Sequence, residues 1–223
     1  MREIVLDTET TGLDPNSGHR VVEIGCIELV NHVATGAVYQ TYVNPERDMP
    51  RDALEVHGLS QEFLNSKPRF AEVVDDFLSF IGDARLVIHN ADFDLGFLNA
   101  ELGRIAYPTL SRARVVDTVQ LARRKYPGAP ANLDALCRRF DIDTTARGRH
   151  RALLDAQLLA EVYLQLLGGR QPGLALAAGA AKPEAAAASN AAVRPPRPHA
   201  ASNEERAAHA AFVDRLKDPI WRD

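Results

Sequence analysis

The chain has 223 residues, of which 46% are hydrophobic, and a formal net charge of −4. This length suits one domain of ordinary size plus an additional segment, and no apolar run is long enough to span a membrane. The negative charge excludes a protein that binds nucleic acid chiefly through bulk positive charge. Cys26 and Cys137 lie in apolar segments without metal-ligand spacing, so we expect free, reduced thiols and a cytoplasmic protein without a signal peptide.

The first strong pattern is an apolar run over residues 4–6, which indicates a buried strand and leads into Asp7 and Glu9. Because side chains alternate across a strand, these two carboxylates project from the same face. Like charges at such positions repel unless a divalent cation such as Mg²⁺ or Mn²⁺ lies between them, and both ions prefer carboxylate oxygen. The alternative is a strand end that turns into solvent.

Further strands and helices follow in an order that predicts the fold class. Val21–Val30 is predicted as the second strand and residues 33–43 as the third, with Gly36 at a hairpin turn or a bulge. The later predictions are strands at 86–88 and 115–117 and helices at 70–81, 95–102, 118–125, 133–140 and 152–167. Strands first, then strands alternating with helices, predict an α/β domain that ends near residue 168, with helices covering a mixed sheet.

The helix predicted over 152–167 contains a charged residue in its apolar stripe. Asp155 lies in line with Leu159 and Val162, so it belongs to the face that is buried. A carboxylate there is costly unless it is paired or bound to a metal ion. The two interpretations are therefore a metal ligand and an ion pair with Arg151 or another arginine.

Two further segments contain residues suited to catalysis. His150 lies in a polar loop five residues ahead of Asp155, and an imidazole at this place suits a general base, with a solvated surface residue as the alternative. Asp92 and Asp94 follow the strand at 86–88, at a strand-to-helix junction where α/β sites commonly gather. Spacing alone does not choose between these two acids, and either could instead cap the helix.

Taken together, these segments resemble a known family. The regions around Asp7 and Glu9, over residues 89–94, and from His150 to Asp155 are similar to the three motifs of the DEDD exonucleases with a catalytic histidine. The resemblance implies a ribonuclease H-like fold and the removal of nucleotides from 3′ ends with two divalent metal ions. It implies His150 as the general base. The four implied metal ligands are Asp7, Glu9, Asp94 and Asp155.

Residues 133–137 and 150–164 resemble, more closely, the proofreading exonucleases of bacterial replicative DNA polymerases, and this resemblance covers about residues 1–176. It implies a single-stranded or frayed DNA 3′ end as the substrate. The residues implied to contact it are Asp7, Glu9, Asp52, His57, His89 and Asp155. Asp52 departs from the pattern, in which Glu is more common. An RNA-directed 3′–5′ exonuclease, oligoribonuclease-like or RNase T-like, would carry the same three motifs and stays the alternative.

The sequence after the exonuclease domain of residues 1–169 changes in composition. Residues 170–176 have the form Gln-x-x-Leu-x-Leu, given by Gln171, Leu174 and Leu176, and resemble the short peptides by which replication proteins bind the sliding clamp. Residues 177–201 contain 12 alanines and 4 prolines, which predict a flexible linker.

The last segment, residues 202–223, is predicted to contain a short helix. Ser202 and Glu205 have capping-box spacing, and an apolar stripe that includes Phe212 and Leu216 follows them. A helix of this length is marginal alone, so we expect it to bind the polymerase catalytic subunit and to bury Phe212, Leu216 and Trp221. Such a tail favours a proofreading enzyme, since RNA exonucleases of this family generally lack one.

Overall fold

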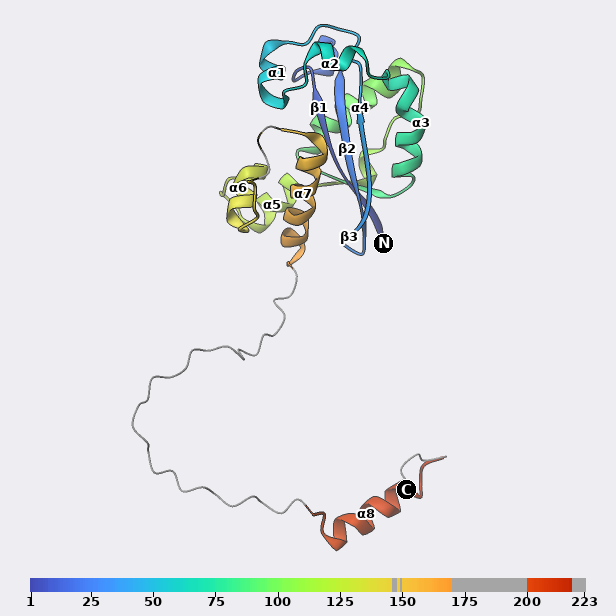
Figure 1. The fold of residues 1–223 in the computed structure, drawn as a ribbon. Coiled ribbons are helices and arrows are strands. Elements are labelled where there is room, and N and C mark those ends of the chain that lie inside the picture. The colour runs from blue at the N-terminus through green and yellow to red at the C-terminus, as the bar shows by residue number, and fades with distance from the viewer. Residues whose placement is uncertain (146–147, 149, 170–199, 218–223) are drawn as a thin grey trace, which may run out of the picture. The chain divides into compact units, whose positions relative to one another are not determined.

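The computed structural model describes residues 1–145, 148, 150–169 and 200–217. The chain forms two compact units, Met1–Ala175 and Leu176–Asp223. The first contains the sheet and its helices, and the described residues of the second contain one helix (Figure 1). The peptide predicted over residues 170–176, with Gln171, Leu174 and Leu176, lies outside the described residues, as do residues 177–199 of the linker predicted over 177–201 and Trp221.

Figure 1 labels most of the elements. The strands are β1 (Arg2–Thr10), β2 (Val21–Val30), β3 (Val33–Tyr42), β4 (Arg85–Ile88) and β5 (Val115–Asp117). The helices are α1 (Arg51–His57), α2 (Gln61–Asn65), α3 (Phe70–Ile81), α4 (Ala91–Arg104), α5 (Thr118–Lys125), α6 (Leu133–Arg139), α7 (Ala152–Leu167) and α8 (Asn203–Val213), with 3₁₀ turns at Pro15–Ser17 and Arg112–Arg114.

The strands form one five-stranded sheet in the order β3-β2-β1-β4-β5. The pairs β1–β2 and β2–β3 are antiparallel, and they are connected by residues 11–20 and by a two-residue turn at Asn31 and His32. The pairs β1–β4 and β4–β5 are parallel, because a helix connects β4 to β5 and several helices precede β4. The prediction of a mixed sheet covered by helices is confirmed.

Alternation along β1 divides the core of this unit into two layers. Ile4 and Leu6 pack in one hydrophobic cluster with residues of α3 and α4, whereas Val5 packs in another with residues of α5, α6 and α7. Figure 1 shows α3 and α7 on opposite sides of the strands. Because alternate residues of a strand share a face, Asp7 and Glu9 point to the side that α7 covers.

Of the two positions predicted for Gly36, a hairpin turn or a bulge, the structure shows the bulge. The chain turns at Asn31 and His32, which have left-handed φ angles of 51° and 66°. Gly36, with φ of 90°, lies inside β3 where the pairing with β2 shifts between Ile27 and Leu29. Residues 35–37 of β3 lie opposite the single residue Glu28 of β2, and these extra residues produce the shift. Glycine accepts the left-handed backbone there without strain.

The sequence predictions fail at two short helices and at the start of α4. The helices α1 and α2, with seven and five residues, were not predicted, since elements this short show no clear helical period. The helix α4 begins at Ala91 and not at Leu95, so Asp92 and Asp94 lie in its first turn. The predicted limits of α3, α5 and α7 match the structure, because these helices carry a regular apolar pattern.

The C-terminal helix α8 begins at the predicted capping box. The Ser202 hydroxyl accepts a hydrogen bond from the Glu205 N–H, and the Glu205 carboxylate accepts one from the Ser202 N–H. Phe212 on this helix is 59% exposed. In the first unit, Cys26 and Cys137 are buried and form no disulfide, as predicted. Among the described residues, no helix is both long and apolar enough to cross a membrane.

Candidate active site

A glycine opposite Asp7 lets the start of α7 pack directly on the sheet. Gly25 on β2 is the pairing partner of Asp7 on β1. A Cβ atom on Gly25 would lie 2.3 Å from the Leu153 nitrogen and 2.4 Å from the Ala152 carbonyl carbon, closer than real Cβ atoms come. This close approach places the first turn of α7, which contains Asp155, over the carboxylates of β1.

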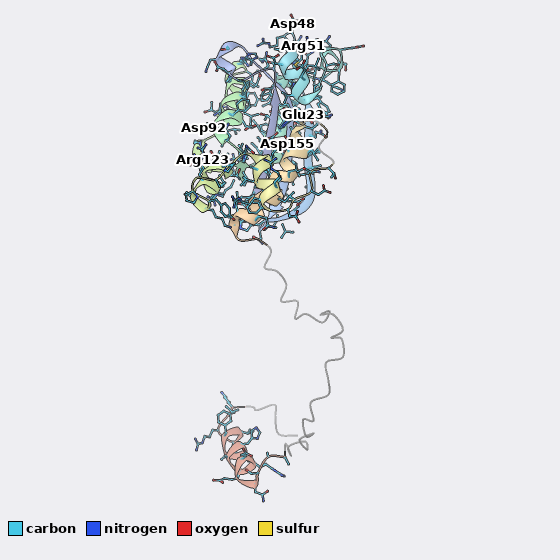
Figure 2. All side chains as sticks on the ribbon, turned by 90° about the vertical axis from the view of Figure 1, so that its left-hand side faces the viewer. Glu23, Asp48, Arg51, Asp92, Arg123 and Asp155 are labelled. Carbon is cyan, nitrogen blue, oxygen red and sulfur yellow. The ribbon has the colours of Figure 1, made fainter. Side chains whose placement is uncertain are left out.

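The approach brings together three of the residues that the sequence singles out. Glu9, His150 and Asp155 each offer one ligand atom, and these atoms all lie within 4.8 Å of one another. Glu9 is 8% exposed and Asp155 is 4% exposed (Figure 2 labels Asp155). Carboxylate oxygens supplemented by an imidazole nitrogen are donors that a divalent cation accepts, so this group fits such an ion. Among the described residues, this is the group of three possible metal ligands whose donor atoms lie this close together. Asp7 and Asp94 are not members of the group.

His150 makes two contacts that define its position. Its Nδ1 lies 2.9 Å from Oδ2 of Asp155, and its backbone N–H donates to the Val56 carbonyl at 3.3 Å. Because a carboxylate only accepts, the neutral ring in this contact has its proton on Nδ1 and a lone pair on Nε2. That tautomer is the one a general base needs. The sequence allowed an ion pair between Arg151 and Asp155. In the structure Arg151 pairs with Glu23 instead.

Asp94 occupies a different place from the other acids. It is 3% exposed, and its Oδ1 accepts hydrogen bonds from the Thr8 backbone N–H at 3.0 Å and from the Thr8 hydroxyl at 2.7 Å. Burial raises the pKa of Asp94 to about 7, while the bonds from Thr8 act in the opposite direction. Thr8 lies between Asp7 and Glu9 in β1, so its hydrogen bonds connect Asp94 to the segment that carries both acids.

The structure also separates Asp94 from Asp92. The Asp92 side chain is 78% exposed and pairs with Nε of Arg112 at 2.9 Å, which is typical of a surface acid. The N-cap of α4 is Asn90, held in the left-handed region at φ 62°. Neither acid is therefore the cap of this helix. A buried position among site residues distinguishes Asp94, and spacing alone did not reveal it.

A pocket of about 500 Å³ opens beside Glu9 and is lined by Asp52, His57 and Phe93, among others. Nδ1 of His57 accepts a hydrogen bond from the Leu59 N–H at 3.0 Å, so the ring proton lies on Nε2. Burial lowers the pKa of His57 to about 4, which keeps the ring neutral at ordinary pH. The residues predicted to contact the terminal nucleotide, Asp52 and His57, thus share one pocket with a predicted metal ligand.

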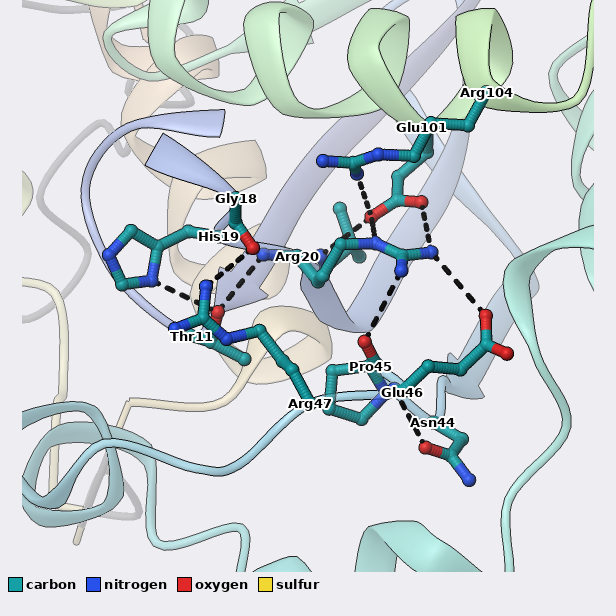
Figure 3. Close-up of polar contacts among 11 residues, drawn as sticks. Thr11, Gly18, His19, Arg20, Asn44, Pro45, Glu46, Arg47, Glu101 and Arg104 are labelled. Atoms are coloured by element: carbon teal, nitrogen blue, oxygen red, sulfur yellow. Dashed lines mark hydrogen bonds and ion pairs between the residues drawn. The ribbon is translucent and has the colours of Figure 1, made fainter. Parts of the chain in front are cut away.

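One wall of this pocket is held by a buried ion pair that the sequence did not indicate (Figure 3). Arg20 binds Glu101, which is 1% exposed, through Nε at 2.7 Å and Nη2 at 2.8 Å. The Arg20 backbone N–H donates to the Thr11 hydroxyl, whose oxygen lies 3.2 Å from Nδ1 of His19. Both Thr11 and His19 line the pocket, so the ion pair with α4 fixes the loop that follows β1.

His89 lies in a different pocket. That pocket, of about 580 Å³, is lined by residues that include Arg123 and Asn132, and it shares no residue with the one beside Glu9. The His89 Nδ1 is 2.8 Å from the Thr118 hydroxyl oxygen, and burial lowers the pKa of this histidine. Contact of His89 with a terminal nucleotide held beside Glu9 stays a prediction.

Comparison with known proteins identifies the class to which this fold and site belong. A family model described as Exonuclease matches residues 4–163, so the chain belongs to the exonuclease family. It is 57% identical over 174 residues to DNA polymerase III subunit epsilon of Rickettsia felis, covering 77% of this chain and 76% of that protein. Against the Escherichia coli subunit of that name it is 48% identical over 176 residues, covering 76% of the chain and 72% of the relative. The resemblance to bacterial proofreading exonucleases is confirmed.

Solved structures support the fold. The nuclease domain of 3′hExo, a DEDDh family member bound to rAMP, has a TM-score of 0.64 at 19% identity, over 74% of this chain and 91% of that one. The zinc-bound form of the E. coli ExoI–ssDNA complex has a TM-score of 0.66 at 18% identity, over 77% and 41%. These likenesses confirm the ribonuclease H-like fold. By its family the chain is a 3′–5′ exonuclease, an enzyme class that depends on divalent metal ions.

Proposed function

We propose that the chain removes nucleotides from DNA 3′ ends as the proofreading subunit of a DNA polymerase III. The observation that carries this proposal is the meeting of Glu9, His150 and Asp155 within 4.8 Å in a chain so similar to epsilon subunits. DNA is favoured over RNA because these relatives are named for a DNA polymerase. A subunit of a bacterial replicative polymerase acts in the cytoplasm, where the chromosome lies.

The proposed ligands for two divalent ions, Mg²⁺ or Mn²⁺, are Asp7, Glu9, Asp94 and Asp155. Glu9 and Asp155 have donor atoms in one group, and Asp7 shares the face of β1 on which Glu9 lies. Asp94 reaches β1 through Thr8. When bound, the ions would supply Lewis-acid stabilisation for the attacking water and for the departing 3′ oxygen.

His150 is the proposed general base. Its Nε2 takes a proton from the attacking water while Nδ1–H stays bound to Asp155. The water oxygen forms a bond to phosphorus, and the bond from phosphorus to the 3′ oxygen breaks. Asp52 and His57 hold the terminal nucleotide in the pocket beside Glu9, where His57 offers its Nε2–H as a donor. His89 contacts the substrate from the neighbouring pocket.

Degradation of end-labelled single-stranded oligonucleotides tests the function. We expect single nucleotides to be released from the 3′ end of DNA with Mg²⁺ or Mn²⁺, and more slowly from RNA of the same sequence. A chelator should abolish release, and restored metal should recover it, because the acids cannot act without cations. Faster degradation of RNA would replace the DNA proposal with the RNA-directed alternative.

Residues 202–223 are proposed to dock on the DNA polymerase III catalytic subunit. Phe212 is 59% exposed on α8, and a helix of eleven residues has too few internal contacts to be stable alone in water. A chain that ends at Gly169 should keep its nuclease activity within about twofold and lose the complex in gel filtration with the polymerase subunit. Co-elution of the shortened chain would move the docking site to the exonuclease domain.

The peptide with Gln171, Leu174 and Leu176 is proposed to bind the sliding clamp. A glutamine that hydrogen-bonds at a pocket rim and two apolar anchors suit such a site. Few residues are buried in such contacts, so affinity should be roughly micromolar or weaker. Changing all three residues to alanine should lower the affinity for the clamp in surface plasmon resonance and leave exonuclease activity on free DNA unchanged. Equal binding by the variant would refute the assignment.

A further inference from the structure

A second acid lies in the core of the sheet next to the site. Glu23 on β2 is fully buried and is the pairing partner of Glu9 on β1 (Figure 2 labels Glu23). Its Oε1 accepts a hydrogen bond from Nε2 of Gln40 at 2.7 Å, and its Oε2 lies 3.3 Å from Nε of Arg151. A buried carboxylate needs such partners, so the position of Arg151 is tied to an acid that cannot move away from the sheet.

Arg151 has a second partner on β3. Its Nη2 donates to the Tyr42 hydroxyl, and its guanidinium carbon lies 5.3 Å from the centre of the Tyr42 ring. The Tyr42 ring is in turn packed edge-on against Phe63 of α2, with centroids 5.0 Å apart. The guanidinium is therefore held both by a carboxylate and by an aromatic ring. This combination matches the planar, delocalised charge of arginine better than that of lysine.

The place of Arg151 in the chain gives these contacts their importance. Arg151 directly follows His150 and is the N-cap residue of α7, with an extended backbone at φ −148° and ψ 124°. Its side chain makes no capping bond to the helix. Because the side chain is tied to β2 and β3, the backbone that carries the His150 ring is tied to the sheet at the same point.

We propose that Glu23, Tyr42 and Arg151, which we call the Arg151 anchor, are positioning residues for His150. The anchor sets the distance between the imidazole and the site of attack, and it acts through the histidine without touching the reacting atoms. This inference rests on the proposed role of His150 as the general base. Misplacement of a catalytic group by about 1 Å can cost on the order of 100-fold in rate, so the anchor should affect kcat.

The test is steady-state cleavage of single-stranded DNA by Arg151→Ala, beside Arg138→Ala, which removes an exposed arginine of α6. We expect kcat to fall about 10- to 100-fold for Arg151→Ala with KM within about twofold, and no change for Arg138→Ala. In a His150→Ala background, Arg151→Ala should have no further effect, because the two residues act as one unit. A raised KM with unchanged kcat would instead make Arg151 a contact for the DNA phosphate and overturn the proposal.

Arg151→Ala leaves Glu23 buried without its cation, which lowers the stability of the variant for a reason unrelated to His150. Thermal unfolding of each variant detects this, and two milder changes then decide. Arg151→Lys keeps a charge near Glu23 but loses the ring contact, and Tyr42→Phe removes only the hydroxyl. Both should fold and show a reduced kcat, with a smaller loss for Tyr42→Phe. A wild-type kcat in both variants would overturn the proposal that the Arg151 anchor positions His150. An inactive wild type, or a fully active His150→Ala, would instead overturn the proposed function.

Discussion

Glu9, Asp94 and Asp155 are 8%, 3% and 4% exposed, whereas the side chain of His150 is 49% exposed. The three acids belong to β1, α4 and α7, and the hydrophobic clusters of both sheet faces fix these elements. His150 precedes α7 and is held by a backbone hydrogen bond to Val56 and by its contact with Asp155. The site thus combines a rigid acidic part with a histidine at its rim.

This difference fits the role proposed for each part in metal-dependent hydrolysis. Like charges repel, so acids that share cations must be held in place by the fold before the cations bind. A general base must instead exchange its proton with water after each turnover, which requires access to solvent. Changes in the acidic part should therefore remove metal binding and activity together, and changes at the histidine should separate the two.

The largest effect is expected for Asp155→Ala. Loss of this buried acid removes a donor from the group with Glu9 and should reduce the rate of DNA cleavage by roughly 10³-fold or more. The fold should persist, because removing one of several repelling acids relieves strain. Cleavage of single-stranded DNA with Mg²⁺ measures the loss, and Glu161→Ala, an exposed acid on the same helix, is the control. Near-normal activity of Asp155→Ala would contradict the ligand assignment.

A smaller but more selective effect is expected for His150→Ala. Without the base the rate should fall by about 10²- to 10⁴-fold, since this is the usual contribution of general acid–base catalysis. Metal binding should persist, because the carboxylates remain. A His150 nitrogen lies within 4.8 Å of donor atoms of Glu9 and Asp155, so this residue could also be a metal ligand. Calorimetric titration of the variant with Mn²⁺ decides whether His150 is a base or a ligand. Loss of a binding event in the variant would make His150 a ligand.

The sheet and the long helices were predictable from the sequence, and Asp7, Glu9 and Asp155 could be singled out as candidates, because their signals are local. Alternation along β1 places Asp7 and Glu9 on one face, and the apolar stripe of α7 reveals Asp155 as an anomaly. The same argument applied to the run around Glu23 would have found that fully buried acid, since it interrupts an apolar strand in the same way. The pairing of Arg151 with Glu23 could not be predicted in this way, because the two residues are 128 positions apart in the chain.

Other features depend on tertiary packing and have no local signal. The choice between Asp92 and Asp94 follows from where α4 begins, which is set by the left-handed Asn90. The separate pocket of His89 is formed by residues that follow β4, by residues of α5 and by the segment that precedes α6, which are distant in the chain. The close approach at Gly25 is likewise a property of two elements that are distant in the chain.

The smallest of the three effects, and the one that tests both parts of the site at once, is expected for Gly25→Ala. The new methyl group would lie 2.3 Å from the Leu153 nitrogen, so the first turn of α7 must move away from β2. Asp155 and His150 would move with it, away from Glu9. We expect a loss of about 1–3 kcal/mol in the free energy of unfolding and a fall of roughly 10- to 100-fold in cleavage rate. The control is Gly103→Ala on α4, where a Cβ meets nothing within 4 Å and which should be neutral or slightly stabilising. Denaturant unfolding and DNA cleavage measure both. If Gly25→Ala lowers stability but leaves the rate at the wild-type value, the contact between α7 and β2 serves the fold alone and does not position the site.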